Sequence, residues 1–209
     1  AISDVVTPDG TLRYAAGELV DTITTGEDGI AKSRELYLGK YSVVEVQAPH
    51  GMLLNSETHE VELTYAGQEI AVTETATDFY NERQKVSVNL SKVMEQNEKY
   101  GIGANGEVVN VSFGLYAAEE LISASGTTIP ADGLIEILMV DENGKAVVSS
   151  DLPLGKYYVK EIATDSHYLL NDAKYPFEFA YAGQTVELVE ITANDGKDIE
   201  NDLIYGSVS

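Results

Sequence analysis

The chain of 209 residues contains no cysteine and no tryptophan, and it has only 3 methionines and 5 prolines. The absence of cysteine excludes disulfide bonds, thiol nucleophiles and cysteine-ligated metal sites. No apolar run approaches the roughly 20 residues of a membrane-spanning helix, and no signal peptide opens the sequence. We therefore expect no membrane insertion in this segment. A chain of this kind that works outside the cell needs some stabilising device other than a disulfide.

Basic residues are also scarce. The chain has 13 Lys and Arg against 35 Asp and Glu, for a formal net charge of −22. This balance repels phosphate groups, so we expect no nucleic-acid partner. The histidines (His50, His59 and His167) lack the spacing of a zinc site or a catalytic triad, and the acidic turn at 141–144 is too short for an EF-hand loop. We expect no metal, no cofactor and no enzymatic activity.

Short segments of alternating polarity are abundant. Tyrosine (13 residues) far outnumbers phenylalanine (4 residues), and tyrosine beside valine and threonine is typical of strands. Apolar and polar residues alternate at 58–63, 86–91 and 157–162. Turn signals separate such segments, at Asp9-Gly10, Asp28-Gly29, Asn105-Gly106, Asp132-Gly133, Asn143-Gly144 and Asp195-Gly196. The sequence predicts an all-β protein of the sandwich type.

An internal repeat sets the domain organisation. Leu38–Tyr41 (Leu-Gly-Lys-Tyr) recurs as Leu154–Tyr157, an offset of 116 residues. The same offset relates Leu53–Asn55 to Leu169–Asn171, Tyr65–Gln68 to Tyr181–Gln184, and Glu45 to Glu161. The second copy then gains four residues, so that Asn81 aligns with Asn201. A match of this length predicts two homologous domains in tandem.

The predicted domains occupy residues 1–84 and 85–205. The second opens with expected strands at 85–93 and 108–117, ahead of the segment that matches residue 1. We therefore expect the first copy to lack its first two strands here, and to be completed by strands from elsewhere or to be incomplete. Residues 206–209 resemble the start of the strand at 85–93 and predict a following repeat. The near absence of a linker favours a rod or stalk.

The repeated motifs resemble a known family, the B-type repeats of Gram-positive pilins and surface adhesins, also called the collagen-adhesin B-region or prealbumin-like fold. The similarity is carried by an E-box stretch at Tyr37–Tyr41, Glu45 and Ala48–Gly51, by its repetition at Tyr157–Glu161, and by a second-strand motif at Phe113–Ala117. It covers essentially the whole chain and implies two tandem Ig-like, prealbumin-like β-sandwich domains. One departure is that Ala163–Ser166 replaces the Ala-Pro-x-Gly element in the second copy.

Members of this family commonly form an isopeptide bond between a first-strand lysine and a last-strand asparagine, promoted by an acidic residue on a middle strand. The resemblance implies these roles for Lys92, Asn201 and Glu161, with Glu161 on the E-box strand and Asn201 opening the closing strand. Glu45 and Asn81 are the equivalents in the first copy, whose lysine would precede residue 1. Burial would favour a neutral amine and a protonated acid, which hydrogen-bonds the amide carbonyl oxygen and passes a proton to the departing ammonia.

Each of these residues also has a plainer interpretation. Lys92 would be an ordinary edge or surface lysine, and the two glutamates would be solvated residues on polar strand faces. Asn194 competes with Asn201 as the acceptor, although it has no counterpart in the first copy.

The resemblance implies a structural role, as a stalk or shaft repeat of a Gram-positive cell-surface protein, extracellular and attached to the cell wall. Its partners would be neighbouring repeats or other pilin subunits. The alternative is an adhesin module that binds a host surface protein or glycan, with Tyr100–Asn110 as the candidate region. The sequence leaves open any ligand and whether a sortase polymerises the parent protein.

Overall fold

The computed structural model describes residues 1–208 and divides the chain into two compact units. Unit 1 comprises Ala1–Ala48 and Leu54–Glu82, and unit 2 comprises Pro49–Leu53 and the chain from Arg83 onward. The described residues form strands and two 3₁₀ turns, with no α-helix among them, so the all-β prediction is confirmed. No helical segment in this part of the chain is long and apolar enough to cross a membrane.

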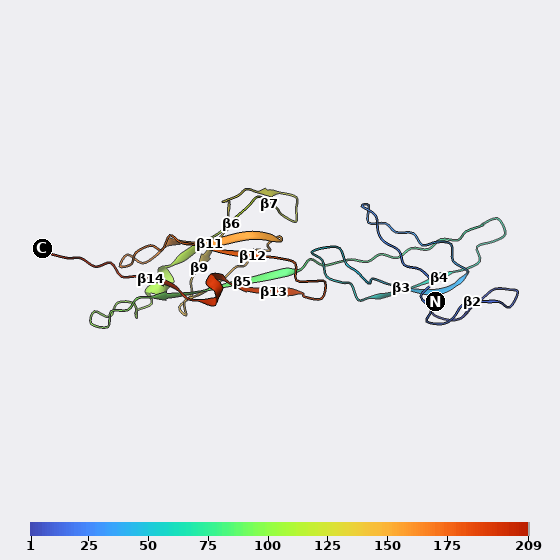
Figure 1. Cartoon of the computed structure of the whole chain (residues 1–209), viewed down its shortest axis with the longest axis horizontal. Helices are drawn as coiled ribbons and strands as arrows, with labels where there is room; N and C mark the ends of the chain where they lie inside the picture. The colour runs from blue at the N-terminus through green and yellow to red at the C-terminus, as the bar shows by residue number, and fades with distance from the viewer. Residues whose placement is uncertain (209) are drawn as a thin grey trace. The chain divides into compact units, whose positions relative to one another are not determined.

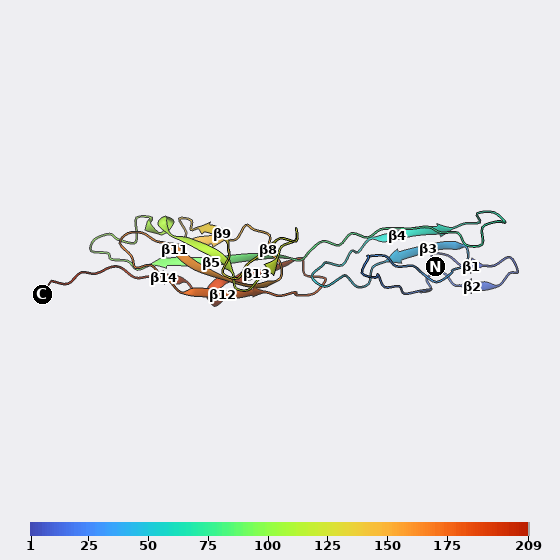
Figure 2. The ribbon, with the colours of Figure 1, turned by 90° about the horizontal axis from the view of Figure 1, so that it is seen from above.

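Unit 1 contains two small antiparallel sheets. Strand β1 (Val5–Val6) pairs with β2 (Leu12–Tyr14), and β3 (Gly39–Val44) pairs with β4 (Thr58–Leu63), as Figure 2 shows. Tyr41 is buried on β3, and its hydroxyl donates a hydrogen bond to the Tyr37 carbonyl. Within residues 1–82 the structure describes no strands that correspond to the first two strands of the second copy.

Unit 2 is built from two four-stranded sheets (Figure 1). One sheet is antiparallel and has the order β12 (Lys174–Phe179), β11 (Gly155–Ala163), β6 (Ser112–Ala117), β9 (Leu134–Met139). In the other, β5 (Lys85–Met94) pairs with β10 (Lys145–Val147), β13 (Leu188–Thr192) and β14 (Ile199–Asn201). A hairpin of β7 (Leu121–Ile122) and β8 (Thr128–Ile129) and the 3₁₀ turns η1 (Glu107–Asn110) and η2 (Ala193–Gly196) complete the unit.

Strand β5 is the central strand of its sheet, because the other three strands all pair with it. It pairs antiparallel with β10, and parallel with β13 along its first half and with β14 along its second. Its inward residues alternate, so Val88, Leu90, Lys92 and Met94 are all buried. Because side chains on a strand alternate between faces, this register directs Lys92 into the interior together with its apolar neighbours.

The core of unit 2 lies between the two sheets and is almost entirely apolar. Its largest members include Phe113, Leu115, Tyr157, Phe179 and Ile199, each with less than 2% of its surface exposed. The Tyr157 ring stacks on Phe177, with 5.4 Å between the ring centroids. An interior of this kind excludes water, so the polar groups inside it have the electrostatics of a low-dielectric medium.

Candidate functional site

Three ionisable or polar side chains lie inside this apolar core. Lys92 is 2% exposed, Glu161 is 0% exposed and Asn201 is 1% exposed. Lysine and glutamate are almost never fully buried without a partner, because removing a charge from water is costly. The solvated interpretation of these residues therefore does not apply in unit 2.

The three residues come from three strands of the two sheets. Lys92 lies on β5 opposite Ile199 of the parallel strand β14, and Asn201 lies opposite Met94 in the same ladder. Glu161 lies on β11 of the other sheet, opposite Phe113. The prediction that Asn201 opens its strand is wrong, because β14 begins at the buried Ile199, after η2, and ends at Asn201.

The Asn201 side chain has a fixed orientation. Its Nδ2 donates to Glu161 Oε1 (2.7 Å), to Thr164 Oγ1 (2.9 Å) and to the Leu169 carbonyl oxygen (2.9 Å). A backbone carbonyl can only accept, so the atom that faces Leu169 is the amide nitrogen. Two buried oxygens are left without a partner, Asn201 Oδ1 and Glu161 Oε2.

The Lys92 amine is held by backbone groups. Its Nζ donates to the Ile199 carbonyl (3.0 Å) and to the carbonyl of Val93. The ion pairs among residues 1–208 do not include Lys92. The amine is therefore buried next to β14 without a carboxylate in direct contact.

Burial changes the protonation of both ionisable groups. It lowers the pKa of Lys92 to about 8, against the opposing charges of Glu161, Glu200 and Asp202. It also raises the pKa of Glu161, against hydrogen bonds from Asn201 and Asn171 and the charge of Lys92. Both shifts favour the neutral forms, which are the forms needed for an amine to attack an amide and for an acid to donate a proton.

The first copy repeats half of this arrangement. Glu45 Oε2 accepts hydrogen bonds from Asn81 Nδ2 (2.7 Å) and from the Asn55 backbone N–H (2.7 Å). In unit 2 the Asn171 N–H likewise donates to Glu161 Oε1 (3.1 Å). Both Glu45 and Asn81 are half-buried. The same glutamate–asparagine contact is thus built twice in one chain.

Two residues beside the carboxyl were not identified from the sequence. Asn171 orients Glu161 through its backbone and ties the loop to β14, since its Nδ2 donates to the Glu200 carbonyl (3.1 Å). The sequence pattern that could have identified Asn171 is the Leu-Leu-Asn motif, which both copies contain. Thr164, which contacts the Asn201 amide, lies in the segment that the sequence marked only as a departure from the family pattern.

The competing candidates lie elsewhere. Asn194 is in η2 and half-exposed, with its Nδ2 donating to the carbonyls of Lys197 (3.3 Å) and Asp198 (3.2 Å). Its amide caps a local turn. Residues 1–208 contain no group of histidine and acidic side chains arranged to hold a metal ion.

Comparisons with known proteins identify the fold. A family model described as SpaA, prealbumin-like fold domain, matches residues 6–78 and 84–197. A trypsin-resistant surface T6 protein of Streptococcus pyogenes serotype M6 is 30% identical over 80 residues, which are 37% of this chain and 15% of that protein.

Solved structures also match this chain, and the first of the following two shares its fold. The Bacillus anthracis TIE protein superposes with a TM-score of 0.58 at 24% identity, covering 87% of this chain and 28% of that one. The T6 backbone pilin of serotype M6 Streptococcus pyogenes has a TM-score of 0.30 at 23% identity, covering 46% of this chain and 16% of that one. The chain spans under a third of the length of each of these relatives. With two matches that together cover most of its residues, the chain belongs to the SpaA family of prealbumin-like fold domains.

Proposed function

We propose that unit 2 forms an isopeptide bond between Lys92 and Asn201 by autocatalysis, promoted by Glu161, and that the chain is a structural stalk or shaft repeat. The observation that carries this proposal is the joint burial of an amine, a carboxamide and a carboxyl group in one apolar interior. Burying ionisable and polar groups lowers the stability of the folded state unless the groups are fully paired. We infer that these three groups are buried together because they react with one another.

The reaction needs no external reagent. Burial favours the loss of a proton from the Lys92 ammonium and the gain of a proton by Glu161, which leaves a neutral amine and a neutral acid. The amine then attacks Asn201 Cγ, the Nζ–Cγ bond forms, the Cγ–Nδ2 bond breaks, and one ammonia departs with a proton delivered through Glu161. Folding holds the reactants together at an effective concentration on the order of 10⁵ M or more, so a single turnover is fast without a second protein.

The two unpartnered oxygens support a protonated Glu161. A proton on Oε2 turns this atom into a donor, and the acceptor without a partner on the facing amide is Asn201 Oδ1. Acid and amide would then pair through both atoms, since Oε1 already accepts from Nδ2 (2.7 Å). The same proton would polarise the carbonyl and stabilise the oxyanion that develops on Oδ1.

For the first copy we propose the same roles for Glu45 and Asn81. Their contact matches that of Glu161 and Asn201, and residues 1–82 supply no strand equivalent to β5. The lysine for this site would come from a strand outside those residues. The first copy would then be closed covalently in the same way as the second.

The proposed setting is outside the cell, attached to the wall of a Gram-positive bacterium, with neighbouring repeats or pilin subunits as partners. Membership of the SpaA family supports this setting, as does the surface location stated in the name of the streptococcal relative. The bond would act between the first and last strands of the repeat. Tension entering at β5 would leave through β14 without separating the strands between them.

The intact mass of the folded chain tests the proposal. We expect a mass lower than the sequence mass by one ammonia, and a peptide that links the segments of Lys92 and Asn201 after digestion. The variants Lys92→Met and Glu161→Gln should show the full sequence mass. Lys85→Met, on the exposed start of the same strand, is the matched control and should keep the deficit. A folded wild-type chain with its full sequence mass would overturn the proposal.

A further inference from the structure

The environment of Asn201 Nδ2 contains more hydrogen-bond acceptors than an amide can use. A carboxamide nitrogen carries two hydrogens. Three acceptors surround this one at hydrogen-bonding distance: Glu161 Oε1 (2.7 Å), Thr164 Oγ1 (2.9 Å) and the Leu169 carbonyl oxygen (2.9 Å). Before the reaction, one of these contacts has no hydrogen to accept.

The number of acceptors matches the product of the proposed reaction. When the Cγ–Nδ2 bond breaks, the nitrogen leaves as ammonia, which is pyramidal and carries three hydrogens. Each acceptor can then receive one hydrogen bond. Interactions that are stronger in the transition state than in the ground state are the ones that accelerate a reaction.

We propose that Thr164 is the third acceptor for the leaving nitrogen of Asn201 and thereby accelerates formation of the Lys92–Asn201 bond. This inference rests on the proposed function. The threonine hydroxyl neither gains nor loses an atom. It accepts a hydrogen bond from the nitrogen as that nitrogen becomes tetrahedral and takes its third hydrogen from Glu161.

The two copies differ at this position. Thr164 corresponds to Ala48 at the offset of 116 residues that relates the copies, and alanine has no hydroxyl. The glutamate–asparagine contact is the same length in both, at 2.7 Å. The hydroxyl therefore has no role in forming that contact, and it remains available for a role in the reaction.

The rate of bond formation tests this role. The full chain is made by cell-free synthesis, quenched at intervals, and the fraction that has lost ammonia is measured by intact mass. We expect Thr164→Val, which keeps the shape and removes the hydroxyl, to slow the reaction about tenfold, the effect of one good hydrogen bond in a transition state. Thr164→Ser should react at close to the wild-type rate. Thr192→Val, at an exposed position on β13, is the matched control and should react at the wild-type rate.

The outcomes separate this inference from the proposed function. If the wild type loses ammonia and Thr164→Val does so equally fast, the role of Thr164 is overturned and the proposed function stands. Equal slowing in Thr164→Ser and Thr164→Val also overturns it, because the hydroxyl would not be the cause. A wild type that never loses ammonia overturns the proposed function itself.

A structural effect of the substitution is measured separately. In the unbonded background Lys92→Met, adding Thr164→Val should leave the denaturation midpoint nearly unchanged. A large drop in that midpoint would show that the threonine acts through folding, and it would overturn the assignment to the leaving group.

Discussion

At the scale of single residues, the candidate site depends on a lysine that the strand pattern forces inward. Lys92 follows Val88 and Leu90 on the buried face of β5. Its environment favours the neutral amine, with the pKa lowered to about 8. In an unbonded chain, burial of Lys92 therefore lowers the free energy of unfolding, by its full amount below about pH 8 and by less as the pH rises to 10.5.

This cost predicts a pH dependence in a variant that keeps Lys92 but cannot react. In Glu161→Gln the lysine has its ordinary pKa of 10.5 in the unfolded chain and a pKa of about 8 or lower in the folded chain. The unfolded state therefore binds more protons between these values, and the free energy of unfolding rises with pH across that window. We expect a gain of about 3 kcal/mol.

The measurement is denaturant unfolding at several pH values. Glu161→Gln/Lys92→Met is the control, since it contains every other titrating group and lacks the buried amine. The difference between the two variants should grow from about pH 8 to about pH 10.5. Parallel curves for the two variants would contradict a neutral, buried Lys92.

At the scale of elements, the turn before β10 fixes the backbone of β5 at Lys92. The Lys92 N–H donates to the Gly144 carbonyl (2.7 Å), and Gly144 has a φ of 72°. A Cβ on Gly144 would lie 2.1 Å from the Lys92 carbonyl oxygen.

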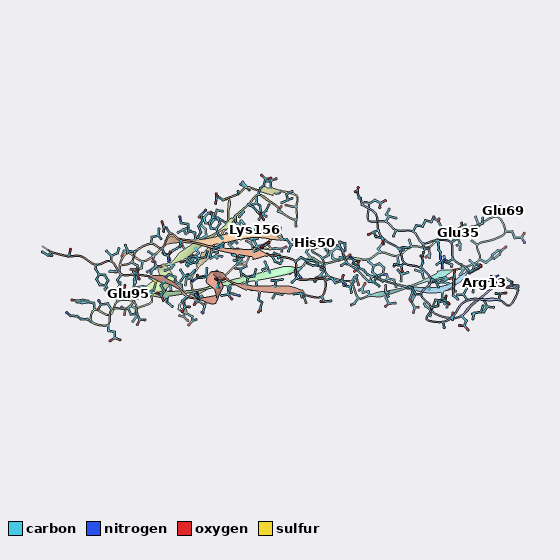
Figure 3. All side chains as sticks on the ribbon, in the orientation of Figure 1. Arg13, Glu35, His50, Glu69, Glu95 and Lys156 are labelled. Atoms are coloured by element: carbon cyan, nitrogen blue, oxygen red, sulfur yellow. The ribbon has the colours of Figure 1, made fainter. Side chains whose placement is uncertain are left out.

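Beyond the other end of the site, Glu95 (Figure 3) accepts from the Leu203 N–H and the Tyr205 hydroxyl, both at 2.7 Å, which ties the chain after β14 to the end of β5.

Gly144→Ala is therefore expected to destabilise unit 2 and to slow bond formation. The substitution combines a left-handed backbone with a contact that only a shift of β5 can relieve, for a cost well above 1 kcal/mol. Gly126→Ala is the matched control, because its φ is 80° and nothing lies within 4 Å of the added Cβ.

Denaturation midpoints and the ammonia deficit measure both effects. Gly126→Ala should cost about 1 kcal/mol, the penalty of the backbone conformation alone, and should leave the bond complete. Equal effects of the two substitutions would show that the approach of the turn to Lys92 has no consequence.

At the scale of the whole molecule, the proposed bond would close a loop of 109 residue steps, from Lys92 to Asn201. It would join β5 to β14, which already pair in parallel (Figure 1). A cross-link over about 100 residues removes roughly 4.7 kcal/mol of conformational freedom from the unfolded chain on the entropy model used for disulfides. The chain has no cysteine and so no disulfide, and the proposed amide cross-link would also remain intact under reducing conditions that break disulfides.

We therefore expect the wild type to unfold at a clearly higher temperature and denaturant concentration than Glu161→Gln. Above about pH 10.5, where the charge on the buried Lys92 of the variant no longer contributes, loop closure should account for a difference of up to about 4.7 kcal/mol. This variant keeps both reacting side chains and loses only the acid. The wild-type advantage should persist in a strong thiol reductant. Coincident unfolding of a bonded wild type and Glu161→Gln would show that the loop closure contributes nothing to stability.

The strands near the repeated motifs were predicted well from the sequence, and the boundaries elsewhere less so. The opening strand was expected at 85–93 and runs over Lys85–Met94, because alternation is a local signal. The next was expected at 108–117, but β6 begins at Ser112 after the turn η1 at Glu107–Asn110. A 3₁₀ turn rich in valine resembles a strand in composition, and only the fold around it decides between them.

The sequence by itself determined that the chain is all-β and repeated, and it placed Glu161 and Asn201 at positions that match Glu45 and Asn81 of the first copy, because alternation and repetition are patterns of local residue order. Lys92 was identified through the family resemblance and not through the repeat. Only the tertiary structure decided which atoms meet. It turned the Asn201 nitrogen toward Glu161, Thr164 and Leu169, and it brought Lys92 beside β14. These contacts join residues 32 to 107 positions apart, and the packing of two sheets around a dry core sets them.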